Sequence, residues 1–314
     1  MNNSEQQYID IIKDILDNGI WKDPARPGMP RTKEVFFRTM TFDLSEGYPL
    51  FTTKKMARKT CLTELTWFLK GDTNIKYLID NGCNIWTDDA YKYYKRHNGT
   101  LDKEAWLELV KAGNIWMKPV ICENGDAIHY TTRRYGDLGR VYGAQWRRYG
   151  LGRFDQVQYV IDNIKSNPNS RYNIINAWNG DEFLGEYADV ALPACHVFYQ
   201  FCVNGDKIDL MVVQRSCDMV LGVPFDIASA GALLMIIAHH TGYIPGKLHW
   251  VGNCCHLYEN HLDAAQELIT REPYKFPKLE INWKNNISNY AKNDFTLIDY
   301  TSHEKLVAPL SVGV

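Results

Sequence analysis

The sequence predicts an α+β fold in a single domain, and three observations support this. Apolar residues recur at helical spacing early in the chain, three runs rich in β-branched and aromatic residues follow, and helical spacing then returns. Separate runs of helix and strand are typical of α+β domains, whereas α/β domains alternate the two. No internal repeat and no Ser/Gly-rich linker interrupts the chain, so we expect one domain over residues 1–314.

The first half of the chain is predicted to be helical. A helix before Gly19 is indicated by apolar residues at helical spacing, namely Tyr8, Ile11, Ile12, Ile15 and Leu16. Another is expected over residues 60–69, and a third between Asp72, a good N-cap, and Gly82. The periodicity weakens at about 87–135, where charged residues and glycines are frequent, and we predict a peripheral insertion there.

The second half begins with a predicted helix at 154–165, which ends before Pro168. Strands are expected at 173–179, 197–203 and 207–214, with Asn204-Gly205 forming a tight hairpin between the last two. Helices are then expected at 227–241 and 256–269. The first of these contains the longest apolar run, which is too short to span a bilayer and predicts a buried helix.

Composition excludes several functions. The 35 basic and 37 acidic residues give a net charge of -2, so we expect no nucleic-acid and no membrane partner. The N-terminus lacks the basic and apolar segments of a signal peptide, which predicts a cytoplasmic protein. Eight cysteines show no paired ligand spacing, so we expect no metal site and predict that most of them fill the core.

Cys195 is a candidate nucleophile. It stands just before a predicted strand, and Pro193 fixes the approach of the chain. A reactive thiolate needs nearby positive charge to lower its pKa, and Arg215 at the end of the partner strand could supply it. On spacing alone, a structural cysteine is the more common alternative.

Six separated motifs resemble the thymidylate synthase family in order and spacing. They are PLFTTK at 49–54, ELTWFLKGDTNI at 64–75, VYGAQWR at 141–147, PACH at 193–196, QRSCD at 214–218 and HLYENH at 256–261. The resemblance extends from about Tyr8 to the C-terminus. It implies a large mixed β-sheet, covered by helices, at the interface of an obligate homodimer. It also implies 5,10-methylenetetrahydrofolate as the one-carbon donor to a pyrimidine nucleotide.

The resemblance also implies roles for individual residues. Cys195 matches the nucleophile that adds to C6 of the pyrimidine and makes C5 nucleophilic, and Glu64 matches the acid/base carboxylate. The implied nucleotide ligands are Arg26, Arg215 and Ser216 for the phosphate, Arg171 from the partner subunit, His256 and Tyr258 for the 3'-hydroxyl, and Gln214. The implied folate-facing residues are Trp86, Asp218, Leu221, Gly222 and Phe225, with a core position as the alternative for Trp86.

Tyr172 and Asp226 are two of the positions that depart from the family pattern. Tyr172 follows Arg171 where the family usually has a second arginine. The resemblance therefore identifies no residue for the second cross-subunit phosphate contact. Asp226 stands where uracil-using members carry asparagine, and we count it among the catalytic residues. An asparagine amide can donate to O4 of uracil and accept from N3–H, whereas an ionised carboxylate only accepts. Cytosine suits aspartate, because its amine donates and its N3 gains a proton as the C6 adduct forms.

Asp226 therefore predicts a cytosine nucleotide, and the same replacement marks the deoxycytidylate hydroxymethylase branch of the family. The C5 methylene becomes methyl by hydride transfer or hydroxymethyl by addition of water, depending on how well water is excluded. Asp89 replaces an aromatic residue and favours water, whereas Trp86 and Leu192 favour hydride.

We expect 5-hydroxymethylation of dCMP. The alternatives are dCMP methylation, CMP hydroxymethylation, and an ordinary thymidylate synthase that acts on dUMP. A catalytically silent RNA-binding or regulatory dimer is the non-enzymatic alternative, and the retained Cys195 and Glu64 argue against it.

Overall fold

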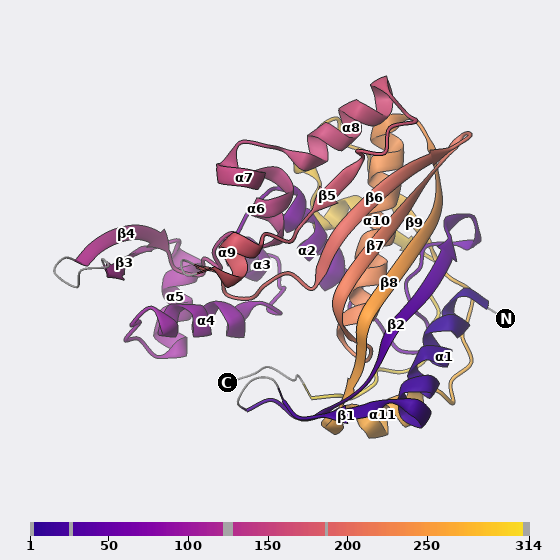
Figure 1. Cartoon of the computed structure of the whole chain (residues 1–314), viewed down its shortest axis with the longest axis horizontal. Helices are drawn as coiled ribbons and strands as arrows, with labels where there is room; N and C mark the ends of the chain where they lie inside the picture. The colour runs from indigo at the N-terminus through magenta and orange to yellow at the C-terminus, as the bar shows by residue number, and fades with distance from the viewer. Residues whose placement is uncertain (1–2, 25–27, 122–127, 186–187, 310–314) are drawn as a thin grey trace.

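The computed structural model describes residues 3–24, 28–121, 128–185 and 188–309. A six-stranded sheet of order β1-β2-β8-β7-β6-β5 forms its centre (Figure 1). The strands are β1 (Ile20–Lys22), β2 (Thr32–Asp43), β5 (Ile174–Asn176), β6 (His196–Asn204), β7 (Lys207–Asp218) and β8 (Ile244–Tyr258). Only β7 and β8 pair in parallel among these neighbours, so the sheet is mixed. The predicted α+β fold class is confirmed.

Helices cover one face of this sheet. The long helix α10 (Gly222–Thr241) packs on β7 and β8 and lies behind them in Figure 1. Next to it are α2 (Arg58–Leu69) and α8 (Gln156–Ser166). The other helices of the main body are α1 (Asn3–Asn18), α3 (Lys76–Asp80), α6 (Tyr142–Arg147), α7 (Tyr149–Gly152), α9 (Gly180–Leu184) and α11 (Leu262–Leu268). Short 3-10 turns lie at Leu44–Glu46 (η1), Glu259–His261 (η2), Ile287–Asn289 (η3) and Lys292–Asp294 (η4), and β9 (Lys278–Ile281) pairs with β10 (Phe295–Ile298).

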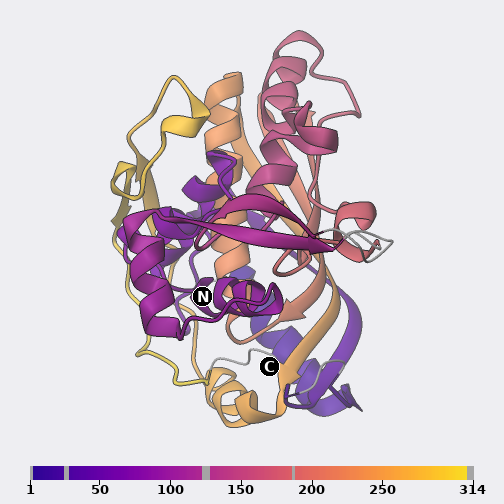
Figure 2. The same cartoon turned by 90° about the vertical axis from the view of Figure 1, so that its left-hand side faces the viewer.

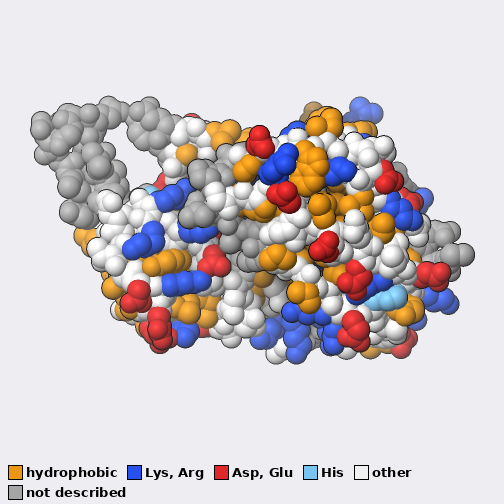
Figure 3. Space-filling model, turned by 90° about the horizontal axis from the view of Figure 1, so that it is seen from below, with side chains coloured by type: hydrophobic (Ala, Val, Ile, Leu, Met, Phe, Trp, Pro, Cys, Tyr) orange, Lys and Arg blue, Asp and Glu red, His pale blue; other side chains and the backbone are white. Residues whose placement is uncertain are grey.

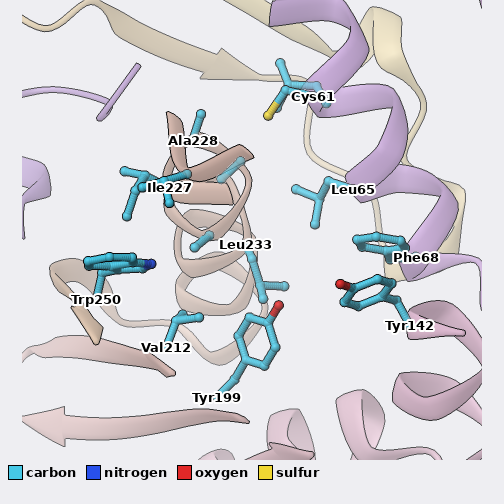
Figure 4. Close-up of a cluster of buried hydrophobic side chains, with 14 of the residues drawn as sticks. Cys61, Leu65, Phe68, Tyr142, Tyr199, Val212, Ile227, Ala228, Leu233 and Trp250 are labelled. Carbon is cyan, nitrogen blue, oxygen red and sulfur yellow. The ribbon is translucent and has the colours of Figure 1, made fainter. Parts of the chain in front are cut away.

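The main core lies between α10, α2 and the sheet. Figure 4 shows its side chains, with Leu65 and Phe68 from α2, Leu233 from α10, and Val212 and Trp250 from the strands. Among the described helices, α10 alone is long and apolar enough to cross a bilayer, but most of its residues are buried inside the protein. The prediction of a buried core helix is therefore confirmed, and its apolar character follows from contact on several sides.

Residues 87–121 and 128–135 project to one side of the sheet in Figure 1 and face the viewer in Figure 2. They form α4 (Thr87–Arg96), α5 (Lys103–Ala112) and the hairpin of β3 (Ile115–Ile121) and β4 (Ile128–Arg134). Buried Trp106 packs against Tyr91 and Tyr94, with ring centroids 5.3 and 6.3 Å away. The aromatic residues of this segment therefore extend the hydrophobic core of the main body.

Three sequence-based expectations need correction. Strands β2 and β8 were not predicted, and β8 carries Pro245, Gly246 and Gly252, which lower strand propensity. The helix expected at 256–269 begins only at Leu262, because the first residues complete β8. The hairpin turn is Gly205-Asp206 rather than Asn204-Gly205, since Asn204 pairs with Lys207 and Gly205 takes φ +65°.

Acidic and basic side chains are interspersed on the face shown in Figure 3. This distribution agrees with the small net charge of the chain.

Candidate active site

A cleft of about 680 Å³ opens where three strands of the sheet meet. The parallel strands β7 and β8 end at the same edge, and antiparallel β6 begins there. Helix α2 and the start of α10 border the cleft from the covered face. The predicted site residues that line it are Glu64, Trp86, Cys195, Gln214, Arg215, Ser216, Asp218, Gly222, Asp226, His256 and Tyr258.

Four predicted site residues are not placed in this cleft. Leu221 and Phe225 are half-buried against the core and are absent from the described residues that line the cleft. Both side chains pack against the core at the start of α10. Arg171 lies exposed between α8 and β5, where its carbonyl accepts a bond from Gln200. Arg26 lies outside the described residues.

Both backbone groups of Cys195, the N–H and the carbonyl, form hydrogen bonds. Its backbone N–H donates to the Tyr142 hydroxyl at 2.6 Å, and its carbonyl accepts from the backbone N–H of Arg215 at 2.8 Å. The Arg215 guanidinium also donates to the carbonyls of Ala194 at 2.7 Å and Pro193 at 3.0 Å. A guanidinium has five N–H donors, so these two bonds leave donors for an anion in the cleft.

Glu64 is a buried carboxyl group on α2. Trp86 donates its indole N–H to Glu64 Oε1 at 2.6 Å. Burial raises the pKa of Glu64 to about 7, although the bond from Trp86 opposes this rise. Glu64 can therefore both give and accept a proton near neutral pH.

Asp226 accepts a hydrogen bond from Gln214, whose amide orientation is fixed. Gln214 Nε2 donates to Asp226 Oδ2 at 2.7 Å and to the Ser216 carbonyl at 3.1 Å. Gln214 Oε1 accepts from the Trp250 indole N–H at 2.9 Å. Since an indole N–H only donates, Gln214 must direct its oxygen to Trp250 and its nitrogen to Asp226.

The Asp226 carboxyl favours its protonated form. Burial raises its pKa to about 8, the negative charges of Glu64 and Asp218 add to the rise, and the bond from Gln214 lowers it. This corrects the sequence argument, which treated Asp226 as an ionised carboxylate. At pH 7 a neutral carboxyl can donate through one oxygen and accept through the other.

Tyr142 and His196 are among the cleft residues that the sequence prediction omitted. His196 Nε2 lies 3.6 Å from Asp226 Oδ1, and its ring stacks on Tyr142 with centroids 4.4 Å apart. Burial lowers the pKa of His196 to about 3, so the ring is neutral. Both residues lie inside motifs that carried the resemblance. Their polar aromatic side chains could have identified them as site residues.

The described residues contain no group of three or more His, Cys, Asp or Glu side chains suited to a metal ion. The polar groups that line the cleft are carboxyls, hydroxyls, two thiols, the Gln214 amide, the imidazoles of His196 and His256, and the cationic groups of Lys22 and Arg215. Together they suit a polar organic ligand with an anionic group.

Comparisons with known proteins show the family of the chain. The thymidylate synthase family model matches residues 6–312. The chain is 41% identical over 313 residues to a thymidylate synthase of Mycoplasma mobile, an alignment that covers 98% of this chain and 100% of that protein. It is 36% identical over 316 residues to a thymidylate synthase of Zymomonas mobilis, with 98% and 100% covered. The chain therefore belongs to the thymidylate synthase family, which uses 5,10-methylenetetrahydrofolate as a cosubstrate for one-carbon transfer.

Proposed function

We propose that this enzyme transfers a one-carbon unit to C5 of dCMP and releases 5-hydroxymethyl-dCMP. The observation that carries the proposal is Asp226, a carboxyl group with a raised pKa at the position of the asparagine in uracil-using members.

Asp226 suits the base edge of cytosine. Oδ2 accepts from Gln214, so the proton of the neutral acid belongs on Oδ1. Such an acid donates to N3 of cytosine and accepts from the 4-amino group. When the Cys195 thiolate adds to C6, N3 gains basicity, and a carboxyl with a pKa of about 8 can transfer its proton there. An asparagine amide cannot make this transfer.

The second candidate function is methylation of dUMP. A neutral Asp226 can also donate to O4 of uracil and accept from N3–H, and two relatives of this chain are named thymidylate synthases. Uracil would use only the hydrogen bonds of Asp226 and not its transferable proton. This difference favours cytosine.

Other cleft residues support the remaining steps. Attack by Cys195 on C6 would convert C5 into a carbon nucleophile, and the raised pKa of the Glu64 carboxyl supports a role in moving protons at the base. Arg215 and Ser216 would hold the phosphate, and His256 with Tyr258 would bind the 3'-hydroxyl. These groups offer no recognition of a 2'-hydroxyl, which favours dCMP over CMP.

The folate side of the cleft combines apolar and polar residues. Trp86 and Leu192 offer apolar surface for a ring system, and the carboxyl of Asp218 offers an acceptor for ring N–H groups. The folate supplies the one-carbon unit and, for a methyl product, also a hydride. Asp89 lines the same cleft and favours water at this wall, which supports the hydroxymethyl product.

We also propose a homodimer formed through the sheet face opposite α10. Large apolar side chains are exposed near the sheet, with Phe36 at 70%, Phe37 at 56% and Tyr172 at 74%. Arg171 lies outside the cleft of its own subunit, as a residue that binds phosphate in the partner subunit would.

The test is mass spectrometry of the products when dCMP, CMP and dUMP are offered together with methylenetetrahydrofolate. We expect 5-hydroxymethyl-dCMP as the main product. Predominant dTMP would establish the second candidate, and 5-methyl-dCMP would correct the assigned product. Failure to convert any nucleotide, with no release of tritium from C5, would favour the silent regulatory dimer.

A further inference from the structure

We propose that helix α4, inside the segment 87–135, positions the loop of residues 188–194. The helix thereby sets the folate-side wall of the cleft, which consists of Trp86 and Leu192. Tyr93 and Arg96 act as positioning residues in this proposal. The inference requires the one-carbon transfer of the family, but it does not depend on which base the enzyme prefers.

Asp189 in this loop is bound from three sides by the segment 87–135. Tyr93 donates its hydroxyl to Asp189 Oδ1 at 2.7 Å, and Arg133 donates to Oδ2 at 2.8 Å. His97 Nε2 lies 3.2 Å from Oδ1. Arg133 also bonds Asp137 at 2.9 Å, which ties the end of β4 into the same group. Since the Tyr93 ring is buried, its hydroxyl is a fixed donor.

The next peptide groups of the loop are held as well. Arg96 donates to the carbonyls of Val190 at 2.9 Å and Ala191 at 3.1 Å. On the other side, the Ala191 N–H donates to the Leu138 carbonyl at 2.8 Å. A Cβ atom at Gly139 would lie 2.1 Å from the Asp189 carbonyl oxygen, so this close approach requires glycine. The loop is therefore fixed between α4 and the segment after β4.

Helix α4 also connects this loop to Trp86, the other apolar residue of the folate-side wall. Trp86 is the N-cap residue of α4, lines the cleft and donates to Glu64. Leu192 follows the residues that Arg96 binds, and it also lines the cleft. One short helix thus bears Trp86 at its start and holds the Leu192 loop near its end. The spacing of these two apolar side chains, and the exclusion of water between them, depend on this helix.

The test uses Tyr93→Phe, Arg96→Gln and the double variant. Tyr93→Phe keeps the buried ring and removes the hydroxyl, whereas Arg96→Gln removes the charge and both carbonyl bonds. Lys95→Gln is the matched control, because Lys95 is an exposed neighbour on the same helix. Assays use whichever of dCMP and dUMP the wild type converts faster, so a wrong base assignment leaves this test intact.

We expect the double variant to raise KM for methylenetetrahydrofolate about ten-fold, the effect of losing a charge-assisted hydrogen bond, with KM for the nucleotide changed less than about two-fold. Any methyl product should decrease relative to hydroxymethyl. Arg96→Lys, which keeps the charge, should restore part of the folate affinity.

The proposal is overturned if the folate KM is unchanged in a folded double variant, or if both KM values rise by the same factor. A general loss of stability would weaken the binding of the nucleotide and of the folate by the same factor. Should Tyr93→Phe fail to fold, Arg96→Gln decides the question alone, because Arg96 is exposed.

Discussion

Replacement of Asp226 by asparagine should stabilise the protein by an amount that depends on pH. The pKa of Asp226 rises from 3.8 to about 8 in the folded protein, so between these values the native state holds one proton more than the unfolded chain. Wild-type stability therefore falls as pH rises through this window. At about 1.36 kcal/mol per unit, the penalty is near zero at pH 4, about 4 kcal/mol at pH 7 and about 6 kcal/mol above pH 8.

Asparagine removes this penalty, because it does not titrate and its oxygen can still accept from Gln214. Urea unfolding of wild type and Asp226→Asn, followed by tryptophan fluorescence from pH 4 to 9 at one protein concentration, measures the difference. The gain in stability should grow across this window and level off above pH 8. Asp206→Asn, in an exposed turn, is the control and should change stability by less than about 0.5 kcal/mol. A gain that does not vary with pH would refute the reasoning.

Three further predictions concern catalysis. Cys195→Ser should abolish turnover but leave nucleotide binding within a few-fold by calorimetry, because Arg215 and the other proposed nucleotide ligands remain; appreciable turnover would exclude Cys195 as the nucleophile. Glu64→Gln should bind both substrates but lose about 100-fold or more in kcat, and a near-normal rate would move the acid/base role elsewhere. Trp86→Phe removes the bond that lowers the pKa of Glu64, so the kcat–pH profile at saturating substrates should move to higher pH; an unmoved profile would show that Glu64 does not control it.

Local patterns predicted the elements that follow a simple period. Helix α10 was expected from its apolar run, and the β6–β7 hairpin from β-branched residues around a turn. Strand β2 was not recognised, because its partner β8 lies more than 200 residues away in the sequence, with Thr32 opposite Tyr258. Pairing at that separation is a tertiary effect that overrides the local propensity of Pro245 and Gly246 in β8.

The chemistry of the site was predictable only in part. The motifs identified Glu64, Cys195 and Asp226 as candidates, and the structure places all three on one cleft. The protonation of Asp226 was not predictable, because it results from burial on α10 beside carboxyls contributed by α2 and β7. Leu221 and Phe225 were assigned to the folate wall by resemblance, but their direction depends on how the first turn of α10 packs.

The most direct test of the central claim is steady-state kinetics of wild type and Asp226→Asn on dCMP and dUMP at saturating methylenetetrahydrofolate. The wild type should have the higher kcat/KM for dCMP. The substitution should lower kcat/KM for dCMP, raise it for dUMP, and change the ratio by about ten-fold or more. A wild type that prefers dUMP, or a ratio that the substitution leaves unchanged, would contradict selection of cytosine by Asp226.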